Sequence, residues 1–232
     1  NKWKPSYSQL TLDRYRDMSE PLWQSSDVIV WPETAVPDFL HYVAEDYLMP
    51  LKERALAEGK TLILGIPVYE HEGPHYFNAV LALGEEPGIY RKRHLVPFGE
   101  YLPLRSIFGD ALDFLGTPHG DFTSGSVMQK PLIAQGRPVA ASVCFEIVFG
   151  DEVRHDAAKA AWLVNVSNDG WFGRSIAPHQ HFQISRMRAL ETNRDLVRAT
   201  NTGISAIIGA DGHVKKRSPQ FEQVETTGDS AL

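Results

Sequence analysis

The sequence contains a single cysteine, Cys144, so no disulfide can form within the chain. A small scaffold held together by disulfides is therefore excluded. The one thiol is either a buried apolar group or a nucleophile. The lack of disulfides is compatible with both oxidising and reducing compartments.

Long apolar runs and an excess of basic residues are also lacking. No segment approaches the roughly 18 apolar residues of a membrane-spanning helix, and no signal peptide is visible. The formal net charge is −6, whereas nucleic-acid-binding domains usually carry basic patches, so we expect no nucleic-acid partner. With 43% hydrophobic and 22% charged residues among 232, the composition predicts a globular protein with a core of ordinary size.

The pattern of apolar residues predicts strands mixed with helices. The predicted strands cover residues 27–32, 61–68, 77–83, 138–144, 161–166, 196–200 and 204–208, and the predicted helices cover 8–25, 39–59, 150–160 and 179–194. Several apolar runs are too continuous for sheets with one solvated face, which indicates an α/β fold with sheets covered by helices. We see no internal repeat or linker, and we predict one domain over residues 1–232.

Two of the candidate catalytic residues follow predicted strands. Cys144 ends the strand 138–144, where backbone N–H groups can stabilise an anion, although burial is the commoner fate of a lone cysteine. Glu33 follows the strand 27–32 and is either a general base with a raised pKa or a charge at a helix N-terminus.

The other candidates are ambiguous by themselves. Lys92 lies in a basic run, which is usually a solvated surface, and Glu100 follows it. Asn168 and Trp171 follow the strand 161–166 and suit either a pocket rim or an ordinary turn with an Asx-type hydrogen bond.

The order Glu33, Lys92, Cys144 resembles the Glu-Lys-Cys triad of the nitrilase superfamily. The local strings resemble the apolipoprotein N-acyltransferase family within it: WPETAVP at 31–37, YRKRHLVPFGEYLP at 90–103, CFEI at 144–147, and the blocks 167–173 and 181–191. The resemblance extends over nearly the whole chain, and the lysine string is its most specific part.

The resemblance implies a nitrilase-like, four-layer α-β-β-α sandwich that lacks its first strand in this chain. Family members carry membrane-spanning helices before and after this domain. We therefore interpret the chain as a fragment of a longer membrane protein. By resemblance, it belongs to the bacterial inner (cytoplasmic) membrane, with the catalytic domain on the periplasmic side.

The implied reaction is acyl transfer through a thioester on Cys144. Glu33 is the expected general base, and Lys92 is expected to stabilise the thiolate and the oxyanion. The implied partners are a phospholipid donor such as phosphatidylethanolamine and the N-terminal amine of a lipidated apolipoprotein. No cofactor is expected: His179 and His181 are spaced like metal ligands, but no carboxylate or cysteine completes a site.

Further residues are expected to support the site. Glu100 and Glu146 are expected to orient Lys92 or hold loops, and Phe145 stands where the family commonly has tyrosine, which keeps an aromatic wall without its hydroxyl. The apolar stretch 98–122 is a candidate lid that meets lipid. The remaining candidate substrate-binding residues are Trp3, Asn168 and Trp171.

Three alternatives stay open. A soluble nitrilase-type amidase would use the same triad to hydrolyse a small amide, although a small polar substrate needs no apolar lid. A catalytically silent domain could bind lipid or protein, but the intact triad argues against it. An isolated fragment could also fold poorly and aggregate through an unpaired sheet edge.

Overall fold

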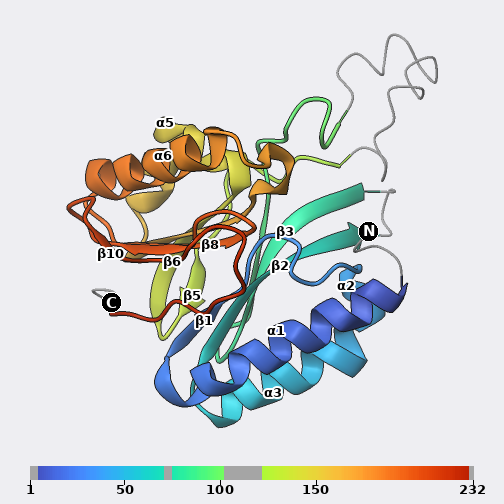
Figure 1. Cartoon of the computed structure of the whole chain (residues 1–232). Coiled ribbons are helices and arrows are strands. Elements are labelled where there is room, and N and C mark those ends of the chain that lie inside the picture. The colour runs from blue at the N-terminus through green and yellow to red at the C-terminus, as the bar shows by residue number, and fades with distance from the viewer. Residues whose placement is uncertain (1–4, 71–74, 102–121, 230–232) are drawn as a thin grey trace, which may run out of the picture.

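The fold was analysed in a computed structural model that describes residues 5–70, 75–101 and 122–229 (Figure 1). Two sheets pack face to face. The first has the order β1-β2-β3-β4, with β1 parallel to β2 and the other pairs antiparallel. Its strands are β1 (Val28–Val30), β2 (Thr61–Glu70), β3 (His75–Leu83) and β4 (Gly88–Arg91).

The second sheet has the order β10-β9-β8-β7-β6-β5. Its three central strands, β6, β7 and β8, are parallel, so their carboxyl ends meet at one edge, where α/β proteins place ligands. The strands are β5 (Leu132–Ala134), β6 (Arg137–Val143), β7 (Trp162–Asn168), β8 (Leu196–Asn201), β9 (Ala206–Ile208) and β10 (Val214–Arg217).

Helices cover the outer face of each sheet. The first sheet is covered by α1 (Pro5–Ser25), α2 (Leu40–Val43), the π-helix η1 (Ala44–Leu48) and α3 (Met49–Ala57), and the second by α5 (Gly150–Ala157) and α6 (Ala177–Thr192). Two short 3-10 helices, η3 (Cys144–Val148) and η4 (Asp169–Phe172), follow β6 and β7. The expected α-β-β-α order of layers is therefore confirmed. Within the described residues, none of the helices is both long and apolar enough to cross a membrane.

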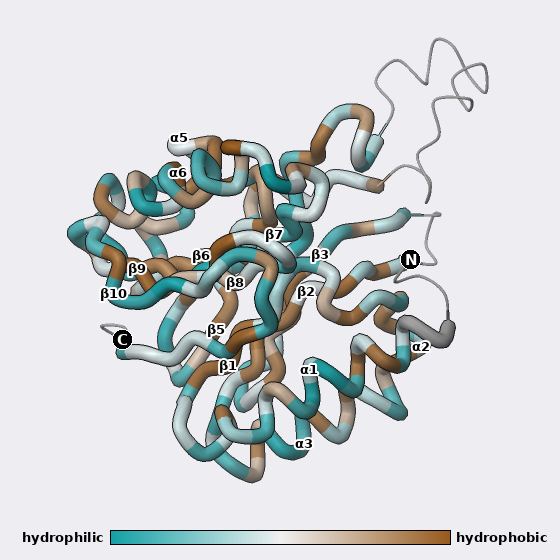
Figure 2. The backbone as a smooth tube through the Cα atoms, viewed as in Figure 1, coloured by the Kyte–Doolittle hydropathy of each residue, from teal (hydrophilic) through white to brown (hydrophobic). Residues whose placement is uncertain are grey.

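Three apolar clusters hold these layers together. One joins the first sheet to α1 and α3, one lies between the two sheets, and one joins the second sheet to α5 and α6. The middle cluster explains why strands of both sheets have continuous apolar sequences, since the inner and outer faces of the sheets are both buried. Figure 2 shows the same distribution, with hydrophobic residues along the inner strands and mixed polarity along the helices.

The structure differs from the sequence-based expectations mainly in short elements. Residues 39–59 were expected to form one helix, whereas a π-helical turn separates α2 from α3. Strands β4, β5 and β10 were not predicted, because three or four residues carry too little periodicity. β1 lies at the edge of its sheet. That a further strand belongs beside it, and that residues 1–232 are one domain, stay predictions.

Candidate active site

Cys144 lies at a tight turn between β6 and η3. It is the first residue of η3, and its φ is +51°. A non-glycine residue in this left-handed region costs of order 1–3 kcal/mol and persists only where its surroundings hold it. The thiol-bearing residue is partly exposed. The turn after a central parallel strand therefore carries the only cysteine of the chain.

Two carboxylates surround the ammonium group of Lys92. Lys92 follows β4 and is almost fully buried, at 1% exposure. Its Nζ lies 2.8 Å from Glu100 Oε2 and 3.9 Å from Glu33 Oε1. Asn78 of β3 bridges the two acids, since its Nδ2 donates to Glu33 Oε1 at 2.7 Å and to Glu100 Oε1 at 3.0 Å. Buried charges are thus paired and hydrogen-bonded, as their desolvation requires.

These charges act on both Lys92 and Cys144. Burial lowers the pKa of Lys92, but Glu33 and Glu100 outweigh burial and raise it above its ordinary value, so the ammonium stays charged. Burial and the charge of Glu33 raise the pKa of Cys144 to about 12, against the opposing effects of Lys92, the Ser167 hydroxyl and the Asn168 N–H. The resting site therefore holds a neutral thiol beside a carboxylate and an ammonium.

Glu146 joins the segment that carries Lys92 to the turn that carries Cys144. Its Oε2 accepts the Val143 N–H at 2.7 Å, and its Oε1 accepts the N–H groups of Arg93 and His94 at 2.8 and 3.1 Å. The Tyr90 hydroxyl donates to both oxygens at 3.1 Å. Burial raises the pKa of Glu146, although these backbone donors oppose the rise. One buried carboxyl thus fixes two of the three candidate residues relative to each other.

Two glycines allow the segments of the site to approach. A Cβ on Gly65 of β2 would lie 2.6 Å from the Pro32 carbonyl oxygen and 2.7 Å from the Thr34 nitrogen. A Cβ on Gly125 would lie 2.4 Å from the Arg91 carbonyl oxygen. No side chain fits either position, so the turns that present Glu33 and Lys92 lie directly against glycine backbone.

The supporting residues expected from the sequence differ in their contacts and in their exposure. Phe145 packs edge-on against Phe149, with ring centroids 5.2 Å apart, and is 36% exposed, which suits a wall. The Asn168 side chain caps η4 by accepting the Gly170 N–H at 3.2 Å, the ordinary turn considered above. Trp171 is 80% exposed. Trp3 and most of the apolar stretch 98–122 lie outside the described residues, and all these roles stay predictions.

Sequence reasoning missed several residues of the site. Asn78 could have been noticed as an amide within an apolar strand, because a buried amide needs partners. Asp169 and Arg198 were missed too; together with His181, which was weighed above only as a metal ligand, they form a second set that contacts the Cys144 carbonyl and is considered below. Within the described residues, no group of three His, Cys, Asp or Glu side chains could hold a metal ion.

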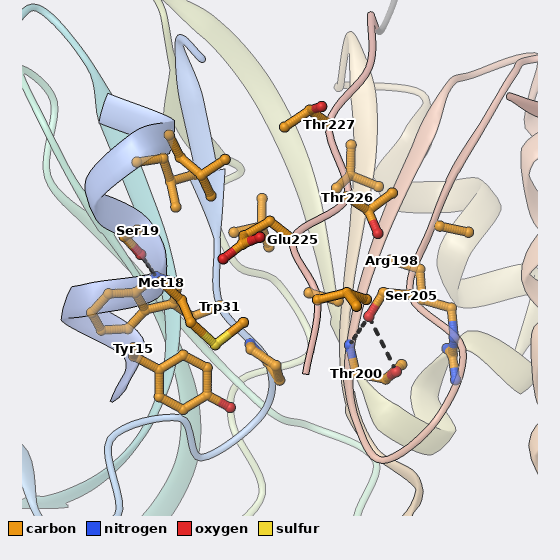
Figure 3. Close-up of a pocket in the computed structure, with 18 of the residues that line it drawn as sticks. Tyr15, Met18, Ser19, Trp31, Arg198, Thr200, Ser205, Glu225, Thr226 and Thr227 are labelled. Carbon is orange, nitrogen blue, oxygen red and sulfur yellow. Dashed lines mark hydrogen bonds between the residues drawn. The ribbon is translucent and has the colours of Figure 1, made fainter. Parts of the chain in front are cut away.

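A groove of about 900 Å³ lies beside this site, between α1, β1, β8 and residues 221–229 (Figure 3). Glu33, Lys92 and Cys144 do not line it. It borders the site through Asn201, which donates to the Glu33 carbonyl oxygen at 2.7 Å and accepts from the Tyr15 hydroxyl at 2.6 Å. Asn201 thus joins the glutamate turn to the wall of this groove, and the groove is not lined by the candidate catalytic groups.

Comparison with known proteins identifies the family. The family model described as carbon-nitrogen hydrolase matches residues 9–228. The chain belongs to the carbon-nitrogen hydrolase family. Its fold is similar to the crystal structure of a carbon-nitrogen hydrolase superfamily protein from Xanthomonas campestris, with a TM-score of 0.71 at 19% identity over 97% of this chain and 85% of that one.

Two relatives within this carbon-nitrogen hydrolase family are named apolipoprotein N-acyltransferase. The protein of Methylococcus capsulatus is 49% identical over 98% of this chain and 45% of its own length. The protein of Nitrosomonas europaea is 43% identical over 95% of this chain and 44% of its own length. The chain thus spans less than half the length of these relatives. The resemblance inferred from the sequence strings is confirmed.

Proposed function

We propose that this chain is the catalytic domain of an apolipoprotein N-acyltransferase that carries the acyl group as a thioester on Cys144. The observation that carries the proposal is the assembly of Glu33, Lys92 and Glu100 beside a cysteine at the end of a parallel strand. The names of relatives matched over 95–98% of the chain support the same activity.

The first half-reaction transfers an acyl chain from a phospholipid to Cys144. Glu33 takes the Sγ proton as Sγ attacks the ester carbonyl carbon, and Lys92 stabilises the oxyanion together with a backbone N–H. The ester C–O bond then breaks, and the departing lysophospholipid oxygen takes the proton from Glu33. The intermediate is a thioester, and Glu33 is again a carboxylate.

The second half-reaction transfers the acyl chain to the N-terminal amine of a diacylglyceryl-modified apolipoprotein. The amine nitrogen attacks the thioester carbon, Glu33 accepts an amine proton, and the C–S bond breaks. Glu33 returns this proton to the thiolate, which binds it readily because the pKa of Cys144 is about 12. The scheme is a two-step covalent transfer, for which ping-pong kinetics are expected.

The charges of the site favour proton transfer from the Cys144 thiol to Glu33 during attack over a thiolate that is present at rest. Before proton transfer, Lys92 is positive, and Glu33 and Glu100 are negative; afterwards the thiolate replaces Glu33 as the second anion. The net charge of the buried site does not change, so no new charge has to be desolvated. The Lys92 ammonium donates to Glu100 Oε1 at 2.9 Å, and its remaining N–H donors are those we assign to the thiolate and the oxyanion.

The substrates imply a membrane setting. We propose that the donor is drawn from the bacterial inner membrane, with this domain on the periplasmic side, and that segments outside this chain provide the membrane contact. No metal or organic cofactor takes part in the proposed steps.

A transfer assay tests the proposed activity. The full-length protein is mixed with phosphatidylethanolamine that carries a labelled acyl chain and with a peptide whose N-terminal cysteine bears diacylglycerol. The proposal predicts labelled amide on the peptide, and none with the Cys144→Ala variant. Hydrolysis of small amides without any transfer would instead support the amidase alternative.

A further inference from the structure

A buried polar cluster lies behind Cys144, and the proposed reaction does not use it. Its members are Asp169 of η4, His181 of α6 and Arg198 of β8, which are 1%, 6% and 1% exposed. They come from three different elements, so the fold brings them together over long range. Three ionisable side chains of this kind are expensive to bury, and a buried ion pair is weak evidence for stability.

The ring of His181 contacts the backbone of the candidate nucleophile. Its Nε2 lies 3.0 Å from the carbonyl oxygen of Cys144. A carbonyl oxygen only accepts, so Nε2 carries a hydrogen and donates it. The Asn165 Nδ2 is a second, longer donor to the same oxygen, at 3.4 Å.

The other nitrogen of the ring has a partner in either protonation state. His181 Nδ1 lies 3.0 Å from Asp169 Oδ1 and 3.1 Å from Arg198 Nη2. A neutral ring accepts from Arg198, and a protonated ring donates to Asp169. Arg198 Nη2 also donates to Asp169 Oδ2 at 3.1 Å, so the ring orientation is fixed by an ion pair.

Asp169 has a further hydrogen-bond partner. The Ser167 hydroxyl donates to Asp169 Oδ1 at 2.9 Å. Asp169 itself has no spare room, because a Cβ on Gly203 would lie 2.2 Å from its Oδ2. The carboxylate that orients His181 is thus itself held in place from several sides.

We propose that His181, oriented by Asp169 and Arg198, is a positioning residue for Cys144: its hydrogen bond to the carbonyl holds the left-handed turn that presents the thiol to Glu33 and Lys92. The inference rests on the proposed role of Cys144 as nucleophile. The turn has φ +51° at a non-glycine residue, and such a conformation needs an external partner to hold it. His181 supplies that partner from a different helix.

Variants of His181 test this proposal in the full-length protein. His181→Ala removes the donor, His181→Gln retains an amide N–H, and His213→Ala changes an exposed histidine as the control. Thioester formation from phosphatidylethanolamine is followed by mass in single turnover. We expect the acylation of His181→Ala to be about 10- to 100-fold slower than that of the wild type, because the nucleophile is misplaced. The half-saturating donor concentration should not change. His181→Gln should recover much of that loss, and His213→Ala should match the wild type.

A second readout separates this inference from the proposed activity. Alkylation of Cys144 by iodoacetamide needs no acyl donor, and its rate against pH reports the surroundings of the thiol. We expect the profile of His181→Ala to shift from that of the wild type and that of His181→Gln to lie nearer to it. If the wild type forms no thioester, the proposed function fails, and the alkylation profiles alone decide the inference. If His181→Ala is acylated and alkylated at the same rates as the wild type, the positioning role is overturned.

Discussion

Glu146 accepts the backbone N–H of Arg93 at 2.8 Å, across 53 positions of sequence. Because the same carboxyl also accepts the N–H of Val143, a displacement of the lysine segment is transmitted to the cysteine turn. The relative position of the candidate catalytic groups therefore depends on a side chain that need not touch substrate.

Glu146→Gln tests this connection. A glutamine must turn its NH₂ group toward at least one of the backbone N–H groups that the carboxyl now accepts, which leaves buried donors unpaired. We expect a loss of about 2–3 kcal/mol in the free energy of unfolding, measured by urea denaturation, and a slower acylation. Glu191→Gln on the exposed face of α6 is the control. Wild-type stability and rate in Glu146→Gln would contradict the role.

Lys92→Met tests the charge balance of the site. Removing the ammonium leaves the buried Glu33 and the partly buried Glu100 as two carboxylates that both accept from Asn78, so we expect a destabilisation of about 3–5 kcal/mol and no acyl transfer. The double variant Lys92→Met with Glu100→Gln should regain part of the stability but none of the activity. Additive losses of stability in this double-mutant cycle would show that Lys92 and Glu100 do not interact.

Gly65→Ala tests the packing under the glutamate turn. The added methyl group would meet the Pro32 carbonyl oxygen at 2.6 Å, so Glu33 must move. We expect a destabilisation of about 1–3 kcal/mol and a fall in kcat with little change in KM. Gly88→Ala is the matched control on the same sheet, since its methyl group would meet only the end of the Leu132 side chain, at 3.2 Å, and no backbone atom. Equal effects of the two substitutions would contradict this account.

The pH dependence of Cys144 alkylation tests the resting state of the thiol. Its pKa is raised from 9.0 to about 12, so the folded site holds a neutral thiol between these values, whereas the unfolded chain ionises. At pH 8 we expect the thiolate fraction, and with it the iodoacetamide rate, to be about 100- to 1000-fold lower in the folded protein than in urea. The wild type should also lose stability relative to Cys144→Ala as the pH rises from 9 towards 12, because only the unfolded thiol releases its proton there. Equal alkylation rates in the folded and unfolded protein at pH 8 would contradict a thiol that stays protonated in the folded site.

The candidate residues that could be predicted from the sequence lie next to local signals. Cys144 and Glu33 stand at the ends of continuous apolar strands. Lys92 lies in the string at residues 90–103, which is specific enough to identify the family resemblance. Continuous apolar runs also predicted the central strands, because both faces of these strands are buried. The four-layer arrangement itself followed from the resemblance.

The partners of these residues could not be predicted, because they depend on long-range packing. Arg198 reads as an ordinary strand cation, and His181 drew attention only because its spacing from His179 resembles that of metal ligands; only the fold places both against Asp169. The π-helical turn between α2 and α3 leaves no periodic signal that distinguishes it from a continuous helix. Asn168 shows how two readings can hold together: its side chain caps a turn, as one reading of the sequence expected, and the same residue lines the groove beside the site.

The most direct test of the central claim is intact-protein mass spectrometry of the full-length protein incubated with phosphatidylethanolamine and no acceptor, before and after neutral hydroxylamine. The account predicts a mass gain of one acyl chain that hydroxylamine removes and that Cys144→Ala lacks. A wild-type protein without any adduct, or an adduct that persists in Cys144→Ala, would contradict a thioester on Cys144.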